Sequence, residues 1–178
     1  MKRRFVMILL LFIGLVGCRM PGTQAPASGT SVPTWQVCFS PLGGCTELVV
    51  QTLAQAKQTV LVQAYSFTSA PIAKALVEAK KRGVTVEAIL DKSQRTERYS
   101  EADFLTHAGI PVRIDAIHAI AHNKVMVIDG ETVITGSFNF TKAAEEHNAE
   151  NLLVLHDQVL AASYEANWHQ HEAHSQLY

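Results

Sequence analysis

The sequence has only three cysteines, few aromatic residues and no excess of charge of either sign. Among its 178 residues, 15 are Lys or Arg and 16 are Asp or Glu, which gives a net charge of −1. Proteins that coat nucleic acid with their whole surface are usually strongly basic, so any polyanion bound here must contact a local basic patch. The sequence also contains no internal repeat, which argues against a solenoid.

Long hydrophobic runs are missing as well. The longest, Phe5 to Val16, has 12 residues, whereas a membrane-spanning helix needs ~20. Because basic residues 2–4 precede this run, we expect residues 1–18 to be a signal peptide. Residues 15–18 (LVGC) resemble the bacterial lipobox, which implies lipidation of Cys18 and a protein exported to the periplasm or cell envelope and anchored to a membrane. An ordinary cleaved signal and an uncleaved anchor are the alternatives.

Residues 19–33 are rich in Pro, Gly and small polar residues and have little with which to build a core. This composition predicts a flexible tether. The remainder, residues 34–178, has the apolar content and length of one globular domain, so we expect a single folded domain there.

Cys38 and Cys45 remain as an even pair if Cys18 carries lipid. In an oxidising compartment such a pair favours a disulfide, and the turn-rich segment between the two residues would bring them together. Two unpaired buried thiols are the alternative. A zinc site is not predicted for this pair, since no second cysteine pair or nearby histidine accompanies it.

Apolar segments of strand type alternate with segments of helix type. The expected strands are residues 35–39, 60–65, 84–90, 112–115 and 149–155; the expected helices are residues 46–57, 70–82 and 101–108 and a last one beginning at Asp157. This alternation predicts an α/β fold with a mixed, largely parallel central sheet flanked by helices on both faces.

A hairpin is expected between residues 123 and 135, with Asp129-Gly130 as its turn. Side chains alternate along a strand, so His122 and Lys124 should share one face with Met126 and Ile128. Asp129 should lie on the other face. We therefore expect its carboxylate to bind backbone groups of the hairpin turn rather than substrate.

Polar residues stand at both ends of this hairpin and suit phosphate chemistry. His122 can attack phosphorus or donate a proton, while Lys124 and Asn139 can hold phosphate oxygens. The spacing H-x-K-x4-D-x6-G-S-x-N resembles the HKD signature of the phospholipase D superfamily. The matching positions are His122, Lys124, Asp129, Gly136, Ser137 and Asn139.

This resemblance implies a phospholipase D-like fold and a phosphodiesterase that works through a phosphohistidine without a cofactor or metal. His122, Lys124 and Asn139 would be catalytic, Ser137 would help to bind substrate, and Gly136 would be structural. Glu150, in the phrase AEN, looks like the family's acid that orients the histidine. It could instead be an exposed edge-strand residue.

The phrases AYSFT, GSFNFTKAAE and AEN are similar to small secreted bacterial endonucleases of this superfamily. Hydrolysis needs two histidines, and this chain has one HxK, so the resemblance implies a homodimer in which two subunits share one site. DNA is the expected substrate, with RNA second and little sequence preference. Alternatives are hydrolysis of phospholipid headgroups and a nucleic-acid-binding role in uptake or secretion with little turnover.

Two further groups of residues leave their roles open. One is basic and could contact flanking phosphates or simply be solvated: Lys80, Lys81, Arg82, Lys92, Arg95 and Arg98. The other is a cluster of histidines near the C-terminus, which could bind adventitious metal but which we expect to be a solvated helix end: His169, His171 and His174.

Overall fold

The computed structural model describes residues 34–178. The signal peptide of residues 1–18, the lipidation of Cys18 and the tether of residues 19–33 are expectations that lie outside the described residues. None of the helices within residues 34–178 is long and apolar enough to span a bilayer.

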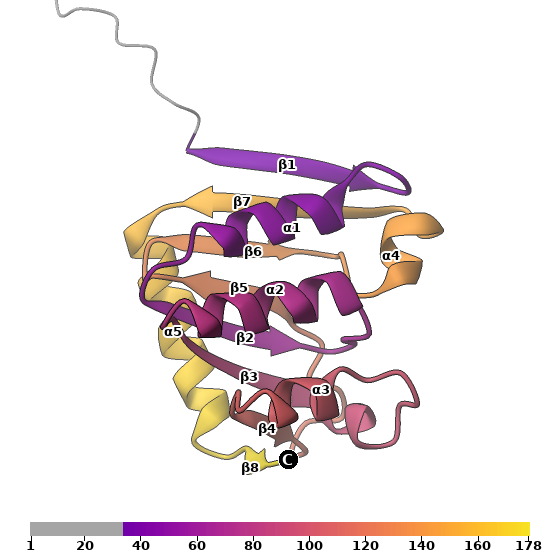
Figure 1. The fold of residues 1–178 in the computed structure, drawn as a ribbon, viewed down its shortest axis with the longest axis vertical. Helices are drawn as coiled ribbons and strands as arrows, with labels where there is room; N and C mark the ends of the chain where they lie inside the picture. Colours follow the sequence, from indigo (N-terminus) through magenta and orange to yellow (C-terminus); the bar gives the residue numbers. More distant parts are fainter. Residues whose placement is uncertain (1–33) are drawn as a thin grey trace, which may run out of the picture. The chain divides into compact units, whose positions relative to one another are not determined.

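Within the described range, one sheet of 8 strands has the order β1-β7-β6-β5-β2-β3-β4-β8 (Figure 1). Its strands are β1 (Trp35–Ser40), β2 (Thr59–Ala64), β3 (Thr85–Asp91), β4 (Val112–Asp115), β5 (Lys124–Ile128), β6 (Thr132–Gly136), β7 (Glu150–His156) and β8 (Gln176–Leu177). The expected mixed α/β sheet is confirmed. Its parallel share is smaller than expected: among the named strands of residues 34–178, β2 with β3 and β3 with β4 pair in parallel and the other strand pairs are antiparallel.

The helices cover both faces of the sheet, as expected. They are α1 (Cys45–Ala54), α2 (Ala70–Lys81), α3 (Ala102–His107), α4 (Lys142–Glu146) and α5 (Gln158–Glu172), with a 3-10 turn η1 (Lys92–Arg95). Helices α1, α2 and α3 lie on one face and α5 on the other (Figure 1). The short elements α4 and β8 were not expected, since neither has enough residues to show a periodic pattern.

Alternation along β5 sends its side chains into two separate cores, as expected. Met126 and Ile128 belong to the larger core under α1, α2 and α3. Val125 and Val127 face the other way and pack with Trp168 of α5. The Trp168 indole N–H donates to the carbonyl of Val62 at 2.9 Å, which satisfies the buried polar group of this ring.

Cys38 and Cys45 form the expected disulfide, which joins β1 to the first turn of α1. The loop between them passes so close to β1 that a side chain at Gly43 would not fit. A Cβ there would lie 1.7 Å from the carbonyl oxygen of Phe39. Glycine is therefore required where the disulfide loop turns back on the strand.

Asp129 is structural, but it binds different backbone groups from those expected. Its carboxylate accepts the backbone N–H groups of Lys57, Gln58 and Thr59, at 2.9, 2.8 and 2.9 Å. These residues lead into β2, so Asp129 fastens the hairpin to the neighbouring strand instead of closing its own turn. Burial alone would raise the pKa of Asp129, but the N–H groups of Thr59, Gln58 and Lys57 hold it below the usual value.

Candidate active site

Strand ends from distant parts of the chain meet along one side of the sheet, where α4 lies in Figure 1. We call this line of strand ends the His122 edge. Ala64 at the end of β2 pairs with Lys124 at the start of β5, and Gly136 at the end of β6 pairs with Leu152 near the start of β7. The residues expected to be functional therefore gather at this edge: His122, Lys124, Ser137, Asn139 and Glu150. Sites in α/β sheets commonly lie beyond strand ends.

The imidazole of His122 is exposed, whereas the backbone around it is fixed. Ala121 donates its N–H to the buried carboxylate of Asp91 at 2.7 Å, and Asn123 accepts the N–H of Tyr65 at 2.8 Å. The Tyr65 ring lies beside the His122 ring, with 4.8 Å between centroids. His122 is thus held in position while its ring stays open to a substrate.

Asp91 connects this segment to the end of β3. Its side chain is buried, and it accepts the N–H groups of Ser93 and Ala121. Burial alone would raise the pKa of Asp91, but hydrogen bonds from Ser93 and Ala121 hold it below its ordinary value. The carboxylate is therefore charged at neutral pH and anchors the residue next to His122.

Lys124 is a nearly buried cation, with 7% of its surface exposed. Its ammonium donates to the carbonyl of His122 at 2.8 Å and lies 5.2 Å from the centre of the Tyr65 ring. Burial lowers the pKa of Lys124, and the negative charge of Glu150 opposes that shift. A cation with little water around it attracts a phosphate oxygen more strongly than an exposed one does.

Gly136 and Ser137 attach the end of β6 to β7. Gly136 has a φ of 144°, and a Cβ there would lie 2.3 Å from the carbonyl oxygen of Asn151. The Ser137 hydroxyl accepts the backbone N–H of Asn151 at 3.0 Å and its side-chain amide at 3.3 Å. Within the chain this hydroxyl therefore holds the start of β7 against the end of β6. A contact between Ser137 and substrate stays a prediction.

Asn139 lies between two buried aromatic residues, Phe138 and Phe140. The carbonyl of Phe140 accepts N–H groups from Thr68 and Ser69, both at 3.0 Å, which ties this segment to the loop after β2. Within residues 34–178, the side-chain oxygen of Asn139 is buried without a hydrogen-bond partner. Its amide therefore has hydrogen-bonding capacity that the chain itself does not use.

Glu150 opens β7 at the same edge. Its carboxylate accepts the side-chain amide of Asn148 at 3.2 Å and acts on Lys124 through its charge. Among the described residues, no hydrogen bond links Glu150 to His122. Its expected role in orienting the histidine therefore stays a prediction.

The basic residues divide between the two edges of the sheet. Lys80, Lys81 and Arg82 lie where α2 ends, before the start of β3 and at the opposite end of the strands from His122, so a contact between these three residues and flanking phosphates stays a prediction. Arg82 donates to the carbonyl of Leu53 at the end of α1, at 2.9 Å. The segment of residues 92–98 follows β3 and lies on the His122 edge.

Sequence reasoning missed several residues that shape the site. Tyr65 packs on His122 and Lys124, Asp91 holds Ala121, and Asn151 binds Ser137. Tyr65 stands in the phrase AYSFT, so the family resemblance was a usable signal for it. The partners of Asp91 and Asn151 lie 30 and 14 residues away, and nothing in the local pattern indicates them.

The expectation of a solvated helix end is wrong for His171 and His174. His171 and His174 both contact the buried carboxylate of Asp115, whereas His169 is exposed. His118 approaches the same carboxylate from the loop before β5. This cluster lies outside the group of residues around His122.

The chain belongs to the phospholipase D superfamily. A family described as "Cardiolipin synthase, PLD-like domain" matches residues 49–171, which include the whole HKD-like segment. The fold, the exposed His122 and the buried Lys124 agree with this membership. By class the protein is a hydrolase that acts on phosphodiesters.

Several individual proteins are also similar to this chain in sequence or structure. A phospholipase D of Rickettsia typhi is 45% identical over 141 residues, which cover 79% of this chain and 69% of that one. A mitochondrial cardiolipin hydrolase of Chlamydomonas reinhardtii is 36% identical over 64% of this chain and 51% of its own. The crystal structure of Nuc from Salmonella typhimurium, a phospholipase D family member, is 43% identical and superposes with a TM-score of 0.78 over 81% of this chain and 97% of that chain.

Proposed function

We propose that this protein is a metal-independent endonuclease that cleaves DNA, and RNA as a second substrate, with little sequence preference. The observation that carries the proposal is that the exposed imidazole of His122 and the nearly buried ammonium of Lys124 both lie close to the ring of Tyr65. This pair provides a nucleophile and a fixed positive charge for a phosphodiester. The resemblance of the phrases AYSFT, GSFNFTKAAE and AEN to small secreted bacterial endonucleases of the superfamily supports nucleic acid as the substrate.

The reaction proceeds in two displacements. In the first, a neutral His122 attacks phosphorus and forms a P–N bond, while the bond to the leaving oxygen breaks and a protonated histidine supplies that oxygen with a proton. In the second, water attacks the phosphohistidine, the P–N bond breaks, and the histidine that gave its proton takes one from the water. Lys124 and Asn139 stabilise the charge on the phosphate oxygens in both steps.

One chain supplies one HxK motif, so the second histidine comes from His122 of the partner subunit. We propose a homodimer with a single site on its twofold axis, where the two imidazoles flank one phosphate. The exposure of His122 at the sheet edge supports this arrangement, because a partner can reach the ring there. Glu150 is the proposed acceptor that holds the second nitrogen of the attacking ring.

Hydrolysis of phospholipid headgroups is the second candidate function. It is favoured by relatives named phospholipase D and mitochondrial cardiolipin hydrolase, with identities of 45% and 36%. The proposed lipid anchor on Cys18, on an exported protein, would also keep the site near a membrane. The chemistry at phosphorus is the same for both substrates. The two candidate functions are therefore distinguished by measuring how fast the protein turns over each substrate.

The experiment is a parallel assay in excess EDTA. The purified protein is incubated with supercoiled plasmid, single-stranded DNA, RNA and labelled phosphatidyl lipids. The proposal predicts cleavage of the nucleic acids in EDTA and little release of headgroup. Faster release of headgroup than cleavage of DNA would favour the second candidate, and loss of all activity in EDTA would refute the metal-independent mechanism.

His122→Ala should abolish turnover in the same assay. His156→Ala is the matched control, since His156 is also exposed but lies at the far end of β7. Its activity should equal that of the unmodified protein. Persistent activity in His122→Ala would mean that another group attacks phosphorus.

A further inference from the structure

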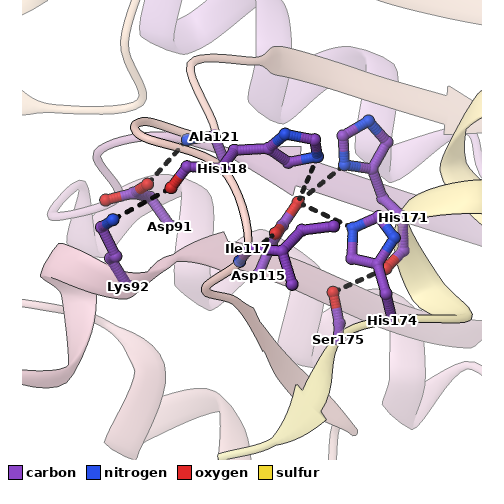
Figure 2. A network of polar contacts seen from close by, with 9 residues as sticks. All are labelled: Asp91, Lys92, Asp115, Ile117, His118, Ala121, His171, His174 and Ser175. Atoms are coloured by element: carbon purple, nitrogen blue, oxygen red, sulfur yellow. Dashed lines mark hydrogen bonds and ion pairs between the residues drawn. The ribbon is translucent and has the colours of Figure 1, made fainter.

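Four side chains from three parts of the chain converge beside the end of β4. Asp115 ends that strand, His118 stands in the loop toward β5, and His171 and His174 come from the end of α5 and the residues after it (Figure 2). Each offers one ligand atom, and these atoms all lie within 4.8 Å of one another. We propose that this cluster is a binding site for one Zn²⁺ ion.

The buried carboxylate of Asp115 is the centre of the arrangement. Its Oδ2 atom lies 2.7 Å from His171 Nδ1, 3.3 Å from His174 Nε2 and 3.6 Å from His118 Nε2. Ligand atoms around tetrahedral zinc are separated by about 3.3 to 3.5 Å, given bonds of about 2.0 to 2.2 Å. Two of the three separations are already close to that range, and the shorter contact between Asp115 and His171 would have to lengthen to admit the ion.

The polar environment of the four groups favours a ligand. Asp115 Oδ1 accepts the backbone N–H of Ile117, which leaves Oδ2 to face the three imidazoles. His118 Nε2 is a buried nitrogen without a hydrogen-bond partner among residues 34–178. A buried nitrogen of this kind loses its hydration without replacement unless an ion or a water binds it.

The donor set selects the type of ion. Imidazole and carboxylate donors suit zinc and other first-row transition ions, whereas Mg²⁺ and Ca²⁺ prefer oxygen donors. Four protein donors fill a tetrahedral coordination sphere and leave no position for water, which is typical of structural zinc. The ion is therefore assigned a structural role, separate from the chemistry at His122.

Zinc at this position would join the end of α5 to the loop that leads to the active site. His118 precedes His122 by four residues, and its carbonyl accepts the ammonium of Lys92 at 2.9 Å. Ala121, in the same loop, is held by Asp91 (Figure 2). The ion would add a third attachment for this loop and fasten the C-terminal segment to β4.

The test measures zinc binding by the full-length protein, purified in detergent and stripped with EDTA. Competition with a chromophoric chelator is expected to give one zinc per chain, with affinity that falls below pH ~6 as the imidazoles take up protons. Saturating zinc should raise the melting temperature by roughly 5 to 10 °C. Mg²⁺ at the same concentration should leave it unchanged.

His118→Ala and His174→Ala should each weaken zinc binding at least about tenfold. His169→Ala is the matched control: His169 is on the same helix, but its partners are Glu165 and Glu172. It should bind zinc like the unmodified chain. Circular dichroism checks that every variant is folded, and if one is not, the conservative His118→Gln or His174→Gln replaces it.

Absence of stoichiometric zinc, or undiminished binding by the folded His118 and His174 variants, would overturn the proposal and leave a network of hydrogen bonds around Asp115. The nuclease proposal is tested independently of this result. In EDTA, well below the melting temperature, His174→Ala should cleave DNA as fast as the unmodified chain.

Discussion

Asp129 belongs to the HKD-like motif, yet its contacts predict a role in stability and not in turnover. Its carboxylate accepts three backbone N–H groups from the segment that enters β2. Asp129→Asn keeps one oxygen, so it retains the bonds to Gln58 and Thr59 but loses the bond to Lys57 and the negative charge. It also keeps a residue type that tolerates the φ of 55° found here.

The expected loss follows from the strength of these bonds. A hydrogen bond to a charged group contributes ~1.5 to 3 kcal/mol and a neutral one about 1 kcal/mol. Lys57 and Gln58 are exposed, so water replaces part of what is lost. We therefore expect Asp129→Asn to lower the free energy of unfolding by about 2 kcal/mol at pH 7, which corresponds to a melting temperature lower by roughly 4 to 8 °C.

The pH dependence gives a second, sharper criterion. The pKa of Asp129 is lower in the folded state, so its contribution is complete above the unfolded value of about 3.9 and disappears as pH falls through the folded value. Urea unfolding at pH 7, 5 and 3 should therefore show a difference between the two proteins that is constant from pH 7 to 5 and shrinks by pH 3.

Glu131→Gln is the control, because it removes a carboxylate from the same hairpin. Within residues 34–178, this carboxylate accepts a hydrogen bond from the side chain of Gln158 and from no other residue. It should change stability little. At 25 °C, folded Asp129→Asn should keep its kcat within a few-fold of the unmodified protein. Unchanged stability together with a large loss of kcat would place Asp129 in the chemistry and refute this reasoning.

Three further predictions concern the site and its support. Gly136→Ala should destabilise the domain by more than about 2 kcal/mol in urea unfolding, because the new Cβ would collide with a β7 carbonyl; an unaffected variant would mean that β6 and β7 separate without cost. Replacing both Cys38 and Cys45 with Ser should cost about 2 kcal/mol in the same assay, and addition of a reductant should then have no further effect. Glu150→Gln should lower the pKa of the Lys124 ammonium, because the charge of Glu150 opposes the lowering of that pKa by burial; an NMR titration of the Lys124 side chain that gave an unchanged or higher pKa would contradict that coupling.

The strands and long helices could be predicted because apolar periodicity is a local property. The hairpin around Asp129-Gly130 and the two faces of β5 follow from residues that are adjacent in the chain. Pairing between strands is not local. Strand β5 pairs with β2 in the antiparallel direction, and no feature of the sequence distinguished this pairing from a parallel one.

The candidate site residues could be named for the same reason: His122, Lys124, Ser137 and Asn139 stand within one short segment. Residues that act through distant partners were missed. Asp115 meets His171 and His174 only because β8 pairs with β4 and brings the end of α5 to that strand. A cluster with sequence separations of 56 and 59 residues gives no signal in a local pattern.

The central claim is that two chains share one site that needs both histidines. Its most direct test is a heterodimer in which one subunit is unmodified and the other carries His122→Ala, isolated through two different tags and assayed on plasmid in EDTA. We predict that this heterodimer is as inactive as the His122→Ala homodimer. Half of the activity of the unmodified dimer would show that each chain works alone and would contradict the account.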